Sequence, residues 1–351
     1  MWAPFRSDAF LRDVLADYEP LGLMARGSRI ATALKCHLPG KYETALEILL
    51  ESLGPKLEKD GYGPLPFYYL PHTTFVAAYG LADFEASMRA QYELTQRFTA
   101  EFSIRPFLER HPDATLSRLA QWTEDPNVHV RRLVSEGTRP RLPWASRLRA
   151  FQKDPRPVLE LLERLKDDPE LYVRRSVANN LNDIGKDHLG LLVETASRWL
   201  KDASPERAWI VKYGLRSAVK RGDASALGVL GYEKGGRVTL ENAVVSPTVA
   251  QVGESVLLTF ELVNQGCDAE RVVVDFRIHF VKANGKSSPK VFKLRAIEFE
   301  KGGRVRLSKK VSLAEMTTRK HYPGVHFVEV LLNGVVQGAG SFELRPAAEK
   351  R

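Results

Sequence analysis

The chain has 351 residues, which corresponds to roughly two or three domains. Its composition is 44% hydrophobic and 27% charged, which excludes the disordered and fibrous classes. The formal net charge is +9 and the pI is about 9.4, so a polyanion such as nucleic acid is a candidate partner.

The same inventory excludes several classes of site. Two cysteines, Cys36 and Cys267, cannot build a disulfide framework, and they fit a reducing cytoplasm. The first residues lack the apolar core of a signal peptide, and no run of about 18 apolar residues predicts a membrane span. There is no P-loop, GxGxxG motif or His/Cys cluster. We therefore expect a cytoplasmic protein with no membrane partner, no nucleotide, no metal and no other cofactor.

The first two-thirds of the chain is predicted to be helical. Residues 1–95 have helical periodicity but no sharp motif, and they predict the N-terminal part of a helical domain. The pattern continues over residues 96–230, for example at Leu159, Leu162 and Leu165.

A ten-residue sequence recurs in this second segment. DPNVHVRRLV at 125–134 matches DPELYVRRSV at 168–177 in six positions, with an offset of 43, and a weaker copy, PERAWIVKY, lies at 205–213. A period of about 40–47 residues is typical of HEAT-type repeats. Each unit is predicted to hold one helix, a turn, and a second helix that Pro126 or Pro169 opens. The expected fold is an α-solenoid of HEAT-like repeats whose second helices line its concave face.

The second helices of the two strong copies are predicted to end differently. In the first copy, Gly137 can form a left-handed cap and Pro140 prevents continuation. Pro143 should then open the next helix, with Trp144 in its first turn. The second copy is expected to run one turn further, because no proline or glycine interrupts it before Gly185.

This difference places acidic side chains together. The 43-residue offset aligns Glu136 with Asn179, and Asp183 lies four residues further along, on the same helical face. Glu136, Asn179 and Asp183 should therefore project together from adjacent helices, with Trp144 at the rim.

Paired carboxylates near an aromatic side chain suit a reaction that develops positive charge, such as glycosidic cleavage through an oxocarbenium ion. Two structural alternatives remain open. Trp144 could fill the core, and the acids could neutralise four neighbouring arginines in a ladder of ion pairs: Arg131, Arg132, Arg174 and Arg175.

The last third of the chain changes character after a glycine-rich linker at 231–236. Alternating β-branched and aromatic residues predict strands at 256–263, 272–281 and 325–332. Asn284-Gly285 and Asn333-Gly334 are typical of type I′ hairpin turns. About seven short strands over residues 237–346 predict an immunoglobulin-like β-sandwich. The antibody-type disulfide is not expected, because this segment has one cysteine and no tryptophan.

Basic residues are concentrated in one part of this sandwich. Residues 282–320 hold 12 Lys or Arg against three Glu. They could be solvated lysines that protect a sheet edge, or a surface that contacts a polyanion.

Two stretches resemble a known family. NVHVRRLVSEGTRPRLPW at 127–144 and YVRRSVANNLNDIGKDH at 172–188 resemble the AlkC branch of the bacterial DNA alkylation repair glycosylases. A looser resemblance covers residues 98–230. The family has HEAT-like repeats, and one subgroup carries a C-terminal Ig-like domain, which fits the sandwich predicted above.

The resemblance implies a monofunctional DNA glycosylase that removes cationic N3-alkylated bases, chiefly 3-methyladenine and 3-methylcytosine. It implies action on the exposed sugar of bent DNA without base flipping. Asp183 matches the catalytic aspartate of the family, where it would stabilise the cationic sugar and position water. Glu136, Trp144 and Glu101 match its other active-site positions. The acids would add negative potential, and the tryptophan would pack against the deoxyribose or wedge at the lesion.

The expected partner is double-stranded DNA that contains alkylated bases, bound by a monomer. Phosphate contacts are expected near the site and in the Ig-like domain, which would clamp the duplex from the other side. The residues are Arg139, Arg141, Arg147, Lys153, Lys186, Lys286, Lys290, Arg304 and Arg306. Two rival functions explain the same fold: a non-catalytic HEAT-repeat scaffold and a structure-specific DNA-binding protein.

Overall fold

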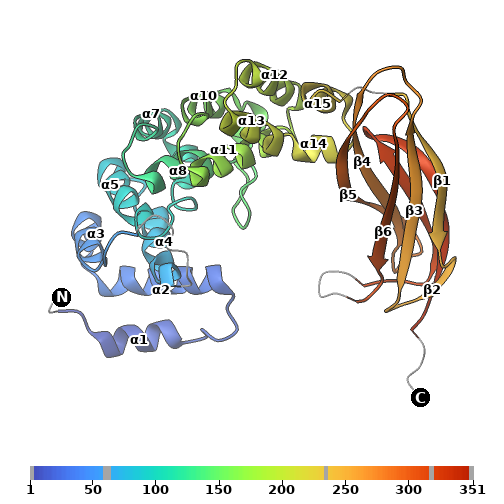
Figure 1. Ribbon diagram of the computed structural model, residues 1–351. Coiled ribbons are helices and arrows are strands. Elements are labelled where there is room, and N and C mark those ends of the chain that lie inside the picture. Colours follow the sequence, from blue (N-terminus) through green and yellow to red (C-terminus); the bar gives the residue numbers. More distant parts are fainter. Residues whose placement is uncertain (1–3, 58–64, 233–235, 316–319, 348–351) are drawn as a thin grey trace. The chain divides into compact units, whose positions relative to one another are not determined.

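The computed structural model describes residues 4–57, 65–232, 236–315 and 320–347, and the chain divides into two compact units, Met1–Gly214 and Leu215–Arg351. The first unit is helical (Figure 1). Its described helices are α1 (Ser7–Leu15), α2 (Leu23–His37), α3 (Tyr42–Glu51), η1 (Leu65–Tyr69, a 3-10 helix), α4 (Leu70–Tyr79), α5 (Phe84–Thr95), α6 (Arg105–Arg110), α7 (Pro112–Trp122), α8 (Val128–Gly137), α9 (Arg149–Lys153), α10 (Arg156–Leu165), α11 (Leu171–Ile184), α12 (Leu189–Leu200) and α13 (Pro205–Gly214).

The repeated sequence forms consecutive helical hairpins, α7–α8, α10–α11 and α12–α13. Figure 1 shows α7, α10 and α12 on the outer side of a curved array and α8, α11 and α13 on its inner side, where α11 packs against both of its neighbours. Of the predicted apolar positions on α10, Leu162 and Leu165 are buried and Leu159 is half-buried. α11 is also longer than α8, with 14 residues against 10, as predicted.

The starts of α8 and α11 differ from the prediction. Each helix begins two residues after its proline, so neither Pro126 nor Pro169 is the first helical residue. The physical reason lies in the aspartate before each proline. Asp125 accepts a hydrogen bond from the backbone N–H of Asn127 (2.8 Å), and Asp168 makes the equivalent turn.

The predicted left-handed cap at Gly137 is also wrong. Gly137 has a negative φ and is the last residue of α8. A Cβ at this position would lie 2.6 Å from Cγ2 of Ile104. Glycine is therefore needed here for close packing and not for backbone conformation.

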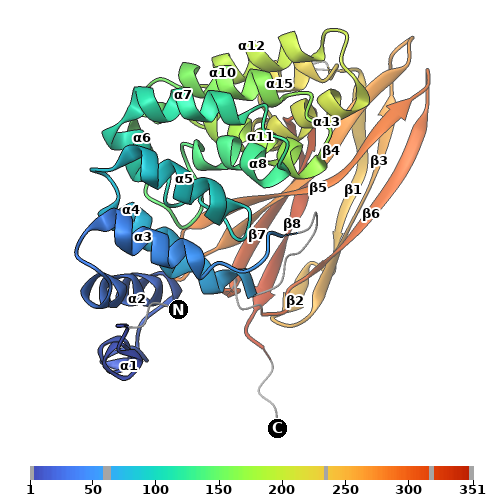
Figure 2. The ribbon, with the colours of Figure 1, turned by 90° about the vertical axis from the view of Figure 1, so that its left-hand side faces the viewer.

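The second unit holds two short helices and a β-sandwich. The elements are α14 (Arg216–Lys220), α15 (Ala224–Val229), β1 (Val238–Ser246), β2 (Val249–Gln251), β3 (Ser255–Asn264), β4 (Glu270–Val281), β5 (Ser287–Phe299), β6 (Arg304–Ser312), β7 (Gly324–Leu332) and β8 (Val335–Arg345). The sheets have the orders β1-β3-β6 and β2-β8-β7-β4-β5, and they form two layers (Figure 2). Alternate side chains of β3 and β4, such as Leu258, Phe260, Val274 and Phe276, fill the core between them.

The chain changes from helix to strand between Val229, where α15 ends, and Val238, where β1 begins. Residues 233–235 of the predicted linker lie outside the described residues. The boundary between the compact units comes earlier, after Gly214, so α14 and α15 group with the sandwich.

One of the two predicted hairpin turns is confirmed. Asn333 and Gly334 both have positive φ, 47° and 77°, as a type I′ turn requires. Asn284 does not, and only Gly285 is left-handed (φ 73°). The carbonyl of Lys282 accepts a bond from the Gly285 N–H (2.9 Å), which gives a longer loop with a single left-handed position. The type I′ prediction at this site is therefore wrong.

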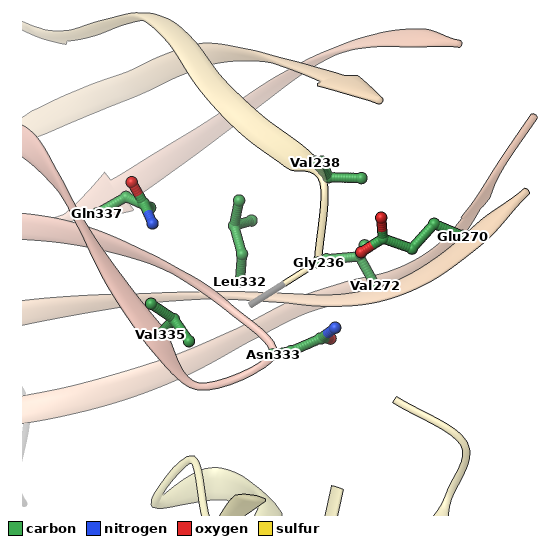
Figure 3. A pocket seen from close by; sticks show the side chains of 8 residues that line it. All are labelled: Gly236, Val238, Glu270, Val272, Leu332, Asn333, Val335 and Gln337. Atoms are coloured by element: carbon green, nitrogen blue, oxygen red, sulfur yellow. The ribbon is translucent and has the colours of Figure 1, made fainter. Parts of the chain in front are cut away.

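The β7–β8 turn also holds the short helices. Gly222, between α14 and α15, lies directly against Gly334: a Cβ on Gly222 would be 2.7 Å from the Gly334 Cα. The same turn borders a cavity of ≈ 40 Å³, which is lined by residues that include Glu270, Asn333 and Gln337 (Figure 3). This volume admits water-sized molecules and is too small for a nucleobase.

We expect Gly222→Ala to destabilise the second unit by about 2–4 kcal/mol, because it adds both left-handed strain and a backbone clash. The matched control is Gly285→Ala, which has nearly the same φ (+73° against +74°) but open space around it. It should lose only about 1–2 kcal/mol. Chemical denaturation followed by tertiary-structure circular dichroism measures both, and equal losses would contradict the backbone contact.

Candidate active site

Two acids from neighbouring helices meet on one arginine. Glu136 of α8 and Asp183 of α11 are 5% and 1% exposed, and Arg139, just beyond α8, is 8% exposed. Arg139 donates from Nη1 to Glu136 Oε1 (2.6 Å) and from Nε to Asp183 Oδ2 (2.8 Å). The structure thus brings together the two acids that were predicted to project from adjacent helices, through a cation that lies between them.

The alternation of charge continues on both sides. Arg132 donates to Glu101 Oε2 (2.6 Å) and lies 3.7 Å from Glu136 Oε1. At the other end, Lys186 Nζ donates to Asp183 Oδ1 (2.8 Å). These six side chains alternate in charge, and we call them the charge row: Glu101, Arg132, Glu136, Arg139, Asp183 and Lys186.

Burial and neighbouring charge act in opposite directions on Glu136. Burial alone would raise the pKa of its carboxyl group. Arg132 and Arg139, together with a hydrogen bond from Ser176 Oγ (2.6 Å), outweigh burial and hold that pKa below its ordinary value. For Arg139, the charges and hydrogen bonds of Glu136 and Asp183 outweigh burial and raise the pKa of its guanidinium group. Glu136 is therefore a buried carboxylate that stays ionised at neutral pH.

Helix length creates this geometry. Pro140 has no N–H, so α8 stops and the chain turns with Arg139 at the start of the loop. α11 continues for one more turn and carries Asp183 to the same point. Asn179, which was expected to project beside the acids, is half-buried one turn earlier on α11.

Trp144 lies on the loop that connects α8 to α9. It is 76% exposed and has a φ of 63°. The next helix begins only at Arg149, so the prediction that Pro143 opens a helix around Trp144 is wrong. The interpretation as a core residue is wrong as well. A left-handed backbone costs a non-glycine residue about 1–2 kcal/mol, and exposure of a large indole adds to this, so the position is typical of a contact residue.

The predicted phosphate contacts fall into three groups. Arg147, Lys153 and Lys186 near the acids are exposed, as are all four in the sandwich: Lys286, Lys290, Arg304 and Arg306. Arg141 makes an ion pair with Asp187, with Nε donating to Oδ2 (2.8 Å). Arg139 is buried between two acids, which is a correction to its expected place on the phosphate-binding surface.

Sequence reasoning missed two polar residues that support the site. Ser176, which donates to Glu136, occupies the position of Leu133 in the first repeat copy. The sequence did contain a signal for Ser176, because a polar residue stands there at a position that is apolar in the other repeat copy. Arg105 binds the loop that carries Trp144, and nothing in the repeat pattern indicated it.

The described residues offer neither a membrane span nor a metal centre. None of their helices is long and apolar enough to cross a bilayer. Within the same ranges, no three or more His, Cys, Asp or Glu side chains gather where they could hold a metal ion.

Comparison with known proteins gives a family. Residues 239–346 match the model described as "Uncharacterised protein YhaZ, C-terminal Ig-like domain". The protein YhaZ of Bacillus subtilis (strain 168) is 38% identical over 341 residues, which cover 97% of this chain and 92% of that protein. The structure of Pseudomonas fluorescens alkylpurine DNA glycosylase AlkC, bound to DNA containing an abasic site analog, is 38% identical, with a TM-score of 0.89.

The AlkC match covers 98% of this chain and 94% of that chain. The chain belongs to the AlkC branch of the DNA alkylation repair glycosylases. The sandwich is the Ig-like domain of its subgroup, and the likeness to AlkC extends over both units.

We expect Arg139→Met to lower the free energy of unfolding by about 3–5 kcal/mol at pH 7, because it leaves two buried carboxylates without their shared cation. The folded-state pKa of Glu136 is lowered from 4.5, so its contribution in the wild type is present above pH 4.5 and is lost as the pH falls through the folded value. Without Arg139, the buried carboxyl can become neutral at higher pH. The difference in unfolding free energy between variant and wild type should therefore begin to shrink above pH 4.5 and shrink further below it.

Urea denaturation at pH 7 and at about pH 4, followed by helical circular dichroism, measures this gap. Arg207→Met is the control, because its ion pair with Asp167 lies at the surface. It should change stability by less than about 1 kcal/mol. A penalty for Arg139→Met that is the same at both pH values would contradict the electrostatic account.

Proposed function

We propose that this chain is a monofunctional DNA glycosylase that removes cationic N3-alkylated bases, chiefly 3-methyladenine and 3-methylcytosine, from duplex DNA. The charge row carries the proposal, because in a family member it gathers two carboxylates on the inner helices α8 and α11 and a third, Glu101, in the turn before α6. We further propose that the helical hairpins are HEAT-like repeats of a solenoid. A monomer would bind DNA with both units.

Excision of a cationic base requires little more than negative charge placed next to the sugar. An N3-alkylated base is already positively charged and leaves readily, so the sugar develops oxocarbenium character with modest assistance. Asp183 is the acid that we assign to stabilise that cation. Each of its oxygens accepts one hydrogen bond, from Arg139 or Lys186, and a carboxylate oxygen has two lone pairs. A free acceptor site on each oxygen can orient the attacking water.

The other two acids extend the negative potential. Glu136 is ionised and buried, and Glu101 is fixed by Thr99 and Arg132. We propose that they act on the lesion or on the water. The exposed Trp144 would pack against the deoxyribose or wedge at the lesion and keep the DNA bent. This arrangement would act on a nucleotide that stays in the DNA duplex, without base flipping.

The exposed cations would hold the phosphates. Arg147 and Lys153 lie on the loop and helix that follow Trp144. In the Ig-like domain, Lys286 and Lys290 lie near the tip of the β4–β5 hairpin, and Arg304 and Arg306 lie on the edge strand β6. We assign the latter four to contacts with the same duplex.

The deciding experiment compares the wild type with Asp183→Asn. Methylated duplex DNA is the substrate, free bases are identified by chromatography, and abasic sites are detected as strand breaks after alkali. We expect the wild type to release 3-methyladenine and 3-methylcytosine. Asp183→Asn should lose about 100-fold or more of this activity while still binding DNA, because it removes charge from the transition state.

Asp168→Asn is the matched control. Asp168 is also a buried aspartate paired with an arginine, Arg131 (2.6 Å), but it lies outside the charge row. It should cost stability and leave excision intact. Because every acid of the row is already paired, a purely structural scaffold remains the second candidate. A folded wild type that binds DNA and releases no base would refute the glycosylase and favour a structure-specific DNA-binding protein, and one that does neither would favour the scaffold.

When DNA binds, we expect the Lys186 ammonium group to leave its ion pair with Asp183 and to contact a DNA phosphate. Lys186→Met should lower the slope of log affinity against log salt by about 0.9, the loss of one phosphate contact. Excision at saturating DNA should persist, since Asp183 keeps its charge. Lys166→Met is the control, because Lys166 makes an equivalent i,i+3 pair with Glu163 away from the row. An unchanged salt slope in Lys186→Met would remove this assignment.

A further inference from the structure

A buried guanidinium holds the loop that carries Trp144. Arg105, the first residue of α6, is 2% exposed. Its Nη1 donates to the carbonyl oxygens of Gly137 (3.1 Å) and Arg139 (2.9 Å), and its Nη2 donates to that of Ser146 (2.5 Å). One side chain thus binds the end of α8 and both sides of the following loop.

Arg105 occupies an unfavourable place for a cation. It makes no ion pair within the part of the chain that the structure describes, and burial lowers its pKa to about 10. It also stands at the start of a helix, where the backbone dipoles disfavour positive charge. A charged group in such a place is destabilising unless its hydrogen bonds compensate. Here all the compensating acceptors are backbone carbonyls at the end of α8 and in the loop that follows it.

That loop has few hydrogen bonds of its own. Pro140 and Pro143 have no N–H to donate. The two backbone bonds within the loop, from Ala145 to Leu142 and from Leu148 to Pro140, are long at 3.4 and 3.3 Å. Its conformation, including the left-handed backbone of Trp144, therefore depends on the Arg105 contacts.

The same arginine joins several parts of the charge row. Its acceptor Arg139 carries the side chain that both acids share, and Glu101 lies four residues before Arg105, in the turn that leads into α6. Ile104 packs against Gly137 at the end of α8. A displacement of Arg105 would move Arg139 and Trp144 together.

We propose that Arg105 is a positioning residue for excision: it fixes the end of α8 and the loop that leads to α9, so that Arg139 spans the two acids and Trp144 stands exposed toward DNA. This inference rests on the proposed glycosylase function. Arg105 touches neither substrate nor reacting atoms, and it acts through the loop.

The test uses the full chain with Arg105→Met, and with Arg105→Lys, which keeps the charge and part of the hydrogen bonding. Single-turnover excision should fall about 100-fold in Arg105→Met, as expected when catalytic groups are misplaced by about 1 Å. Affinity for DNA with an abasic-site analogue should change little, because phosphate contacts supply most of it. Arg105→Lys should recover part of the rate.

Arg174→Met is the matched control. Arg174 also donates to two backbone carbonyls, of Asp168 (2.9 Å) and Pro169 (2.7 Å), and its Nε is likewise buried without a partner. It should reduce stability without slowing excision. In a Trp144→Ala background, Arg105→Met should slow excision less than it does in the wild type, since part of its effect passes through Trp144.

A readout that needs no activity separates this inference from the proposed function. The protein is labelled with 5-fluorotryptophan, and the Trp144 resonance is assigned with Trp144→Phe. In Arg105→Met that resonance should shift while those of Trp122 and Trp199 stay. An unmoved Trp144 resonance, wild-type excision in Arg105→Met, or a loss equal to that in Arg174→Met overturns the proposal. If the wild type releases no base, the glycosylase fails, and the fluorine spectrum still decides the role of Arg105.

Discussion

The site depends on one guanidinium that two carboxylates share. Arg139 binds Glu136 and Asp183, which belong to the second helices of consecutive repeat units. Burial of Glu136 as a carboxylate requires a cation, and burial of Arg139 requires the acids. Because the contact crosses from one hairpin to the next, it fixes the register of α8 against α11 as well as the positions of the charges. Helix packing and the candidate chemistry are thus stabilised by the same contact.

A repeat architecture explains how such a contact arises. Each hairpin presents equivalent positions to the next, so a substitution in one copy faces a defined position of its neighbour. Ser176 in place of Leu133 gives Glu136 a hydrogen bond, and the additional turn of α11 brings Asp183 to Arg139. The site therefore consists of departures from the repeat, and the regular positions, such as Val130 and Val173, remain as core.

This distinction explains what the sequence could predict. Regular features follow from period and pattern, so the hairpins, the longer α11 and strands β3, β4 and β7 were all foreseen. Features that depend on a single local contact or turn were not predicted. Asp125 and Asp168 form turns ahead of their prolines, Gly137 serves close packing, and Trp144 lies in a loop. Arg105 was invisible because its acceptors are backbone carbonyls, which leave no trace in side-chain patterns.

The balance of charge in the row has a consequence for selectivity. With three acids and three cations the row is neutral, so an uncharged nucleotide gains little from it. A unit charge at about 4 Å is worth about 4 kcal/mol at an effective dielectric of 20, nearly a thousandfold in rate. Lys186 is the most exposed cation of the row. If it moves to a phosphate when DNA binds, it no longer neutralises Asp183. The interaction energy between Asp183 and a substrate cation then reaches about this value only in the DNA complex. A cationic base on its sugar would then meet a net negative site and leave as a neutral molecule, whereas a normal base would have to leave as an anion, which a negative site disfavours.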